Sequence, residues 1–171
     1  MEIVDLFIGS ALNAVDAKGR VSLPSSYRGT IERRQQRMAA PGGPLADKLV
    51  TFVSHDTRTC LIGFDAAYGQ VMMQAVQARV AAAAAADPFA AMQDGQMDMF
   101  SATHEVSYDP SGRMCLPQHL RDEAGITDLA FFVPGGQIFQ LWDPEAFQRE
   151  CPELVKAQRQ LTALLNERAA K

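Results

Sequence analysis

Short apolar runs occur in pairs, one pair in each half of the chain. Residues 49–53 and 60–64 form the first pair, and residues 129–133 and 138–142 form the second, with a polar or glycine-containing turn inside each pair. Apolar runs of about five residues bounded by turn residues are typical of strands, and two such runs joined by a tight turn indicate a β-hairpin. The pattern therefore predicts one hairpin in each half.

The segment between the hairpins has the composition of a helix. Residues 66–86 are nearly all good helix formers and end in six consecutive alanines, so one long helix is expected there. Asp87 and Pro88 are a capping residue and a first-turn residue, and they predict a shorter helix that ends before Asp94-Gly95. The other elements are predicted at these residues: strands at 6–15, 21–23 and 101–108, helices at 25–37 and 118–125, a terminal helix that starts at 143 and is reset at Pro152-Glu153 before it continues to the end, and a loop at 39–44.

A nine-residue motif occurs twice. The first copy is Asp16-Ala-Lys-Gly-Arg-Val-Ser-Leu-Pro24, and the second, 93 positions later, is Asp109-Pro-Ser-Gly-Arg-Met-Cys-Leu-Pro117. In both copies an arginine, Arg28 or Arg121, follows the proline by four residues. A hairpin and then a helical segment follow each copy in the same order. The simplest interpretation is two copies of one supersecondary unit.

Each motif has the residues of a tight turn followed by a short strand. Asp16 and Asp109 can accept hydrogen bonds from nearby backbone N–H groups, and Gly19 and Gly112 can take the positive φ that a reversal needs. One interpretation is purely structural, with the aspartate holding the turn and the arginine pairing with it. The alternative, favoured by the duplication, is that two arginines project in a related geometry to contact phosphate or guanine.

Charge is distributed unevenly along the chain. The net charge is −4, but residues 1–60 carry eight Lys and Arg against six Asp and Glu, whereas residues 61–171 carry eight against fourteen. An anionic partner is therefore expected to bind the N-terminal half. Within the motifs, Lys18 adds a point charge for phosphate to the first copy. The second copy has Pro110 and Ser111 instead, so it is the poorer phosphate ligand.

Composition argues against a disulfide-rich, zinc-binding, secreted or membrane protein. The 171 residues, 47% of them hydrophobic, suit one compact domain or two joined halves. Three widely spaced cysteines predict neither a disulfide framework nor a zinc knuckle, and Cys115 is expected to be a small buried residue. No apolar run approaches the roughly 20 residues that cross a bilayer, and the first residues lack a basic leader, so neither secretion nor membrane insertion is expected. His55, His104 and His119 lack metal-ligand spacing and are predicted to be surface or core residues.

The sequence closely resembles the MraZ family. The resemblance rests on Phe7-x-Gly9, on the two motifs with their following arginines, and on Leu141-Trp142-Asp143, and it covers nearly all of residues 5–150. It implies an α+β fold in which two tandem swapped-hairpin AbrB-like β-elements form an internal pseudo-dimeric β-barrel with flanking helices. The implied units are a first AbrB-like repeat at 5–65, a helical connector at 66–100, a second repeat at 101–147 and a C-terminal helix at 148–171.

The resemblance also implies a function. Members of the family are bacterial transcriptional regulators that form ring-shaped homo-oligomers and bind short tandem repeats upstream of the division and cell-wall gene cluster, so a sequence-specific repressor is expected. The Asp-x-x-x-Arg turns form the DNA surface in that family. Carried over by position, the DNA contacts are Lys18, Arg20 and Arg113, the turn-stabilising residues are Asp16, Gly19, Asp109 and Gly112, and Arg28 and Arg121 are accessory DNA contacts. The protein is then expected in the cytoplasm, associated with the nucleoid, with no cofactor, metal or small-molecule substrate.

Two other functions are weighed against DNA binding. An enzyme would use Asp16 and Asp109 as an acid pair, but the neighbouring arginines keep such carboxylates ionised and neither motif holds a histidine, so no catalytic residue is assigned. An oligomeric protein-interaction module would use its helices, and the motifs would then serve only the fold. The abundant Met and Ala between residues 72 and 100 fit this alternative.

Overall fold

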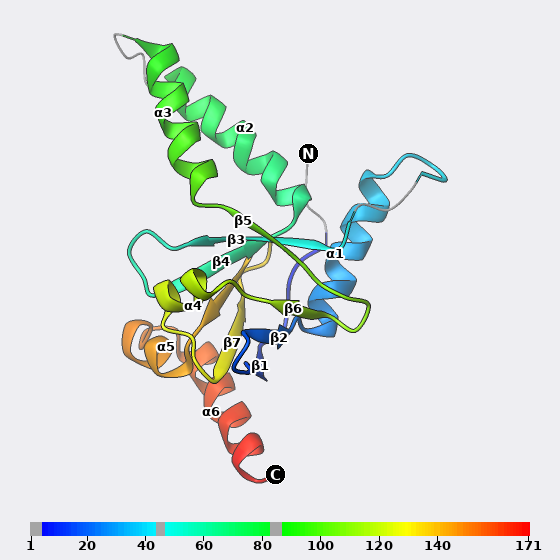
Figure 1. The fold of residues 1–171 in the computed structure, drawn as a ribbon, viewed down its shortest axis with the longest axis vertical. Coiled ribbons are helices and arrows are strands. Elements are labelled where there is room, and N and C mark those ends of the chain that lie inside the picture. The colour runs from blue at the N-terminus through cyan, green and yellow to red at the C-terminus, as the bar shows by residue number, and fades with distance from the viewer. Residues whose placement is uncertain (1–4, 44–46, 83–86) are drawn as a thin grey trace.

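The structure is a computed structural model that describes residues 5–43, 47–82 and 87–171. It has an α+β fold, as predicted, with antiparallel strands at the centre and helices around them (Figure 1). The strands in these ranges are β1 (Ala11–Ala14), β2 (Arg20–Ser22), β3 (Leu49–Ser54), β4 (Cys60–Phe64), β5 (His104–Ser107), β6 (Arg113–Cys115), β7 (Leu129–Pro134) and β8 (Phe139–Trp142). The helices are α1 (Ser25–Met38), α2 (Ala66–Ala82), α3 (Pro88–Ser101), α4 (Gln118–Ala124), α5 (Pro144–Glu150) and α6 (Val155–Ala169). None of these helices is both long and apolar enough to cross a membrane.

Each half of the chain adds its first strand to the hairpin of the other half. β1 pairs with β7, and β5 pairs with β3, so the six-stranded sheet has the order β1-β7-β8-β4-β3-β5. The two pairings have equivalent registers, because Ala14 lies opposite Leu129 just as Ser107 lies opposite Leu49. The predicted hairpins β3–β4 and β7–β8 are confirmed, and they meet along β4 and β8 in the middle of the sheet. The two halves therefore share one sheet through exchanged strands.

A separate two-stranded ribbon of β2 and β6 joins the two motifs. Val21 lies opposite Met114, its own counterpart in the repeat, so a pseudo-twofold axis passes between these residues. Two further backbone hydrogen bonds follow the same symmetry: Leu23 N–H to Gly112 O at 2.7 Å, and Leu116 N–H to Gly19 O at 2.9 Å. Val21 and Met114 are both buried, so the residues on either side of them face outward.

The strands do not pair into a closed barrel. Among the described residues, β1 and β5 are the two edges of the six-stranded sheet, and the ribbon is a sheet of its own. Each edge strand has only four residues before the chain turns at Asp16 or Asp109 and enters the ribbon. The ribbon touches the larger sheet through an isolated bridge between Tyr108 and Met114. The strand exchange is thus present, but the predicted pseudo-dimeric barrel is not confirmed.

Aromatic side chains fill the core on one face of the sheet. The rings of Phe7, Tyr27 and Phe139 pack mutually, with centroids 5.0–5.2 Å apart. Phe132 belongs to this core, whereas its neighbour Phe131 belongs to a second apolar cluster with residues of α5 and α6. Successive side chains of a strand point to opposite faces, so β7 supplies both cores. Both faces of the sheet are therefore covered.

The helical connector differs from its prediction in one respect. The helix that begins after Asp87 continues through Asp94 and Gly95 to Ser101, instead of ending there. A glycine inside a helix costs only about 1 kcal/mol, and the packing of α3 along α2 outweighs that cost (Figure 1). Asp87 caps α3 as predicted, because its side chain accepts two backbone N–H groups of the first turn. Residues 83–86, the predicted end of the preceding helix, lie outside the described residues.

A buried ion pair joins α1 to the residue before α2. The side chains of Arg34 and Asp65 are each 3% exposed, and Arg34 Nη1 donates to Asp65 Oδ1 over 3.0 Å. Asp65 also accepts the backbone N–H of Tyr68 and so caps α2. The Arg34 guanidinium donates further to three backbone carbonyls, those of Asp5, Gly136 and Gln137. One side chain thus ties together the N-terminal segment, α1 and the β7–β8 turn.

Gly63 in β4 lies against the ring of Phe139. A Cβ at this position would overlap the carbon atoms of that ring. We expect Gly63→Ala to lower the free energy of unfolding by about 1–3 kcal/mol, because the ring must shift within a closed core. Urea denaturation measures this change. Gly95→Ala is the control, since a Cβ there meets nothing within 4 Å and an alanine in a helix adds about 0.5–1 kcal/mol of stability; equal losses in both variants would contradict the prediction.

Candidate nucleic-acid interface

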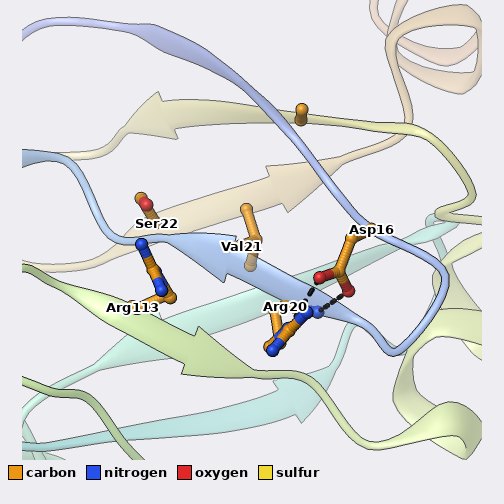
Figure 2. Close-up of a pocket in the computed structure, with 6 residues that line it drawn as sticks. Asp16, Arg20, Val21, Ser22 and Arg113 are labelled. Carbon is orange, nitrogen blue, oxygen red and sulfur yellow. Dashed lines mark hydrogen bonds and ion pairs between the residues drawn. The ribbon is translucent and has the colours of Figure 1, made fainter.

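The first motif folds as a tight turn held by the Asp16 carboxylate. Its Oδ1 accepts the backbone N–H groups of Lys18 and Arg20, both at 2.9 Å. Its Oδ2 accepts the Arg20 Nε–H at 2.6 Å, and Figure 2 shows both contacts between Asp16 and Arg20. Gly19 reverses the chain with a φ of +82°. The Arg20 side chain is 52% exposed, and its Nη groups make no hydrogen bond to any residue that the structure describes. The carboxylate therefore orients the guanidinium while its outer edge stays open to an external acceptor.

The second motif forms the same turn with a different closing contact. Asp109 Oδ1 accepts the backbone N–H groups of Ser111 and Arg113, at 3.0 and 2.9 Å, and also the Ser111 hydroxyl at 2.7 Å. Gly112 reverses the chain with a φ of +86°. Within the described ranges, Arg113 has no ion pair with Asp109. The Ser111 hydroxyl thus supports the second turn, and the exposed Arg113 side chain is less constrained than Arg20.

The two arginines lie on the outer face of the ribbon, one on each strand. Arg20 lies opposite Cys115, and Ser22 lies opposite Arg113, so the arginines are diagonal neighbours across the pseudo-twofold axis. Diagonal neighbours on one face of a sheet are about 7–8 Å apart. Two open hollows flank the ribbon, and both arginines line each of them. Asp16 and Ser22 are among the other residues that line the first (Figure 2), and Asp109 and Cys115 are among those that line the second. The sequence repeat thus becomes one surface with two related halves.

The position of Cys115 corrects its prediction. It was expected to be buried, but it is exposed on the outer face of β6 and its thiol donates to the backbone carbonyl of Lys18 over 3.2 Å. Met114 and Leu116, on either side of it, point into the core. Strand alternation therefore forces Cys115 outward. The alternation was visible in the motif, and it also identifies Ser22, which had not been singled out as a surface residue.

Arg28 and Arg121, the arginines that follow each motif, cross over to the turn of the other half. A Cβ on Gly112 would be 2.7 Å from Arg28 Nε, and a Cβ on Gly19 would be 2.7 Å from Arg121 Nε. Arg28 Nη1 also donates to the Pro110 carbonyl over 2.8 Å. Both arginines are half-buried. Each arginine packs against the glycine of the opposite turn, so a side chain at Gly19 or Gly112 would clash with it.

Hydrogen bonding keeps both turn carboxylates ionised. The pKa of Asp16 lies below its usual range because the Arg20 backbone N–H and then the Arg20 guanidinium donate to the carboxylate. The pKa of Asp109 is also lowered, first by the Ser111 hydroxyl and then by the Arg113 backbone N–H. Both groups are exposed, so the shifts come from direct contacts with the ionised form. Neither carboxylate is therefore suited to donate a proton near neutral pH.

These contacts predict a dependence of stability on pH. A carboxylate whose pKa is lower in the folded than in the unfolded chain stabilises the fold above the unfolded value, here 3.8, and this contribution is lost as the pH falls through the folded value. We expect the wild type to lose stability more steeply below pH 3.8 than a variant with Asp16→Asn and Asp109→Asn. Urea denaturation at a series of pH values measures the difference. Asp56→Asn, outside both motifs, is the control, and parallel curves for the wild type and the double variant would contradict the prediction.

The sequence analysis did not predict that His104 and His119 lie close together. His104 on β5 and His119 at the start of α4 bring their Nε2 atoms to 3.1 Å. Their separation in the chain shows no ligand spacing, because the contact depends on how α4 packs against the sheet. No cluster of three or more His, Cys, Asp or Glu residues suited to a metal ion occurs in the part of the chain that the structure describes.

The fold and the paired turns define a class of internally duplicated α+β proteins in which an arginine-bearing ribbon lies on the pseudo-twofold axis. A family model described as "MraZ protein, putative antitoxin-like" matches residues 99–164. The chain belongs to the MraZ family. Three relatives, each named "Transcriptional regulator MraZ", come from Gluconobacter oxydans (31% identical, covering 84% of this chain and 79% of the relative), Ruegeria pomeroyi (30%, covering 92% and 88%) and Rickettsia canadensis (27%, covering 85% and 87%).

Proposed function

We propose that this chain is a transcriptional regulator that binds double-stranded DNA sequence-specifically and represses transcription. Its targets in this proposal are short tandem repeats upstream of the division and cell-wall gene cluster. Support comes from the names of the relatives, which are transcriptional regulators, and from the geometry of the two turns. The same names point to a protein that is not an enzyme.

The observation that carries the proposal is the exposed pair of Arg20 and Arg113 on the outer face of a two-stranded ribbon. The major groove of B-DNA admits such a ribbon, and an arginine can bind guanine there through two hydrogen bonds. Lys18, exposed next to Arg20, supplies a charge for phosphate. Four residues support these contacts by shaping the turns: Asp16, Gly19, Asp109 and Gly112.

Oligomerisation would make this small surface effective. Three basic side chains on a chain of net charge −4 give weak and salt-sensitive DNA binding. A ring-shaped homo-oligomer that engages evenly spaced repeats raises the affinity without any new kind of contact. In this proposal residues 5–65 and 101–147 are the two repeats, residues 66–100 connect them, and residues 148–171 are a C-terminal unit that contains the end of α5 and all of α6. The protein acts in the cytoplasm at the nucleoid.

The test is binding of the purified protein to DNA from upstream of its own gene. Fluorescence anisotropy would compare fragments with intact and with scrambled repeats at about 50 to 200 mM salt, the range over which phosphate contacts weaken strongly. We expect tighter binding to intact repeats and a steep loss of affinity with salt. Equal binding to both fragments would overturn the proposal of sequence specificity.

A second candidate function is binding of a protein partner through the helical connector. Phe89, Met97 and Phe100 on α3 are exposed, at 65%, 69% and 47%. Their spacing places them along one side of the helix, and apolar side chains grouped on a surface are typical of sites of protein interaction. In this case Lys18 and Arg20 would serve only the turn. Unchanged regulation in a variant carrying Lys18→Gln and Arg20→Gln would favour this function over DNA binding.

A further inference from the structure

The contact between His104 and His119 has the geometry of two ligands of one metal ion. Their Nε2 atoms are 3.1 Å apart, and their ring centroids are 4.4 Å apart with planes inclined at 62°. With metal–nitrogen bonds of about 2.0–2.1 Å, two neighbouring imidazole nitrogens are roughly 2.9 Å apart in an octahedral site and roughly 3.3 Å apart in a tetrahedral one. The observed separation falls between these values, so an ion can bridge the rings with little movement.

The backbone positions of both histidines are fixed by the fold. His104 lies in β5, opposite Phe52 of β3, and Phe52 is fully buried. His119 is in the first turn of α4, which Leu120 and Ala124 anchor in the core. Neither side chain is itself buried, so the pair is open to ions from solvent. The two ligands are therefore pre-positioned and accessible.

The pair occurs in one half of the chain only. The repeat places Ala11 and Ser26 at the positions equivalent to His104 and His119, and neither side chain is a usual transition-metal ligand. Glu123, one helical turn beyond His119, is hydrogen-bonded to Ser54. The candidate site therefore has two protein ligands, the two imidazoles, and water would fill the rest of the coordination sphere.

We propose that His104 and His119 chelate one divalent late transition-metal ion per chain, of the class Ni²⁺, Cu²⁺ or Zn²⁺. Neutral imidazole suits these ions, whereas Mg²⁺ and Ca²⁺ prefer oxygen. In the metal-free contact one Nε2 carries the proton and donates to the other. Metal binding needs a lone pair on both Nε2 atoms, so in the donor ring the proton moves to Nδ1. Between two neutral rings, this exchange of tautomers releases no proton.

The test is isothermal titration calorimetry of the full chain with NiCl₂ and with ZnCl₂. We expect one equivalent to bind per chain. Because the second imidazole acts at a high effective concentration, His104→Gln or His119→Gln alone should weaken binding by on the order of 10-fold or more. The double variant should bind little more weakly than either single variant, since each single change already destroys chelation. MgCl₂ should not bind at this site.

His55→Gln is the matched control, because His55 lies in the β3–β4 turn, outside the pair, and its Nδ1 accepts backbone N–H groups there. It should leave the affinity unchanged. Unfolding curves in EDTA would establish that all variants remain folded. Three outcomes would overturn the proposal: no binding by the wild type, equal effects of all three histidine substitutions, or independent and additive losses from His104→Gln and His119→Gln.

Discussion

Under the proposed function, Arg20→Ala is expected to abolish specific binding to repeat-bearing DNA while leaving the proposed oligomer intact. Loss of one bidentate arginine–guanine contact costs about 1–3 kcal/mol of discrimination, and the loss is repeated at every subunit that engages a repeat. The Arg20 side chain is 52% exposed, and its one side-chain partner among the described residues is the exposed Asp16, so the fold should tolerate the change. Fluorescence anisotropy with intact and scrambled repeats measures specificity, and size-exclusion chromatography with light scattering measures the assembly.

Arg37→Ala provides the control for the loss of positive charge. Arg37 lies in the last turn of α1, is 61% exposed and pairs with Asp5, away from the ribbon. This variant should keep its preference for intact repeats. Arg113→Ala should act in the same direction as Arg20→Ala, because the two residues share the outer face. Specific binding that survives both ribbon substitutions would refute a DNA role for the ribbon, and disassembly caused by Arg20→Ala would make that residue structural.

Asp65→Ala is expected to lower the free energy of unfolding by about 3–5 kcal/mol. The change leaves the Arg34 guanidinium, 3% exposed, without its countercharge and also removes the cap of α2. Urea denaturation measures the loss. A double variant, Arg34→Met with Asp65→Leu, should be more stable than Asp65→Ala, because it removes both buried charges together.

An exposed ion pair gives the comparison for this prediction. Arg58 and Glu153 lie 3.4 Å apart, with side chains 36% and 57% exposed. Exposed pairs contribute about 0–1 kcal/mol, so Glu153→Ala should have little effect on unfolding. If Asp65→Ala costs no more than Glu153→Ala, the buried pair is not the connection between α1, α2 and the β7–β8 turn that its contacts indicate.

The two hairpins and the repetition of the turn motif in both halves were predictable from the sequence, because local patterns determine them. The apolar runs of β3, β4, β7 and β8 and the turns inside each pair reflect strand alternation and turn chemistry. The repeated motif located both Asp-Arg turns. Asp16 and Asp109 hold those turns through bonds to residues only two to four positions away. Interactions between residues so close in the chain can be predicted from the sequence.

Contacts between distant parts of the chain were not predictable in the same way. The ion pair of Arg34 with Asp65 and the contact of His104 with His119 each depend on how a helix packs against other elements. The continuation of α3 through Gly95 likewise depends on α2, since the local residue preference favours a break. Composition and spacing carry no information about these tertiary contacts.

Because two related but unequal halves are joined in one chain, the two turns of the ribbon differ from each other. A symmetric homodimer must present identical turns, and so it matches palindromic DNA. Here one turn offers Lys18 next to Gly19 and Arg20, and the other offers Ser111 next to Gly112 and Arg113. Tandem duplication allows the two halves to diverge while their exchanged strands still pair. In the proposed DNA complex, such a ribbon would distinguish one direction along a duplex from the other, which is the property needed to read direct repeats in a fixed orientation.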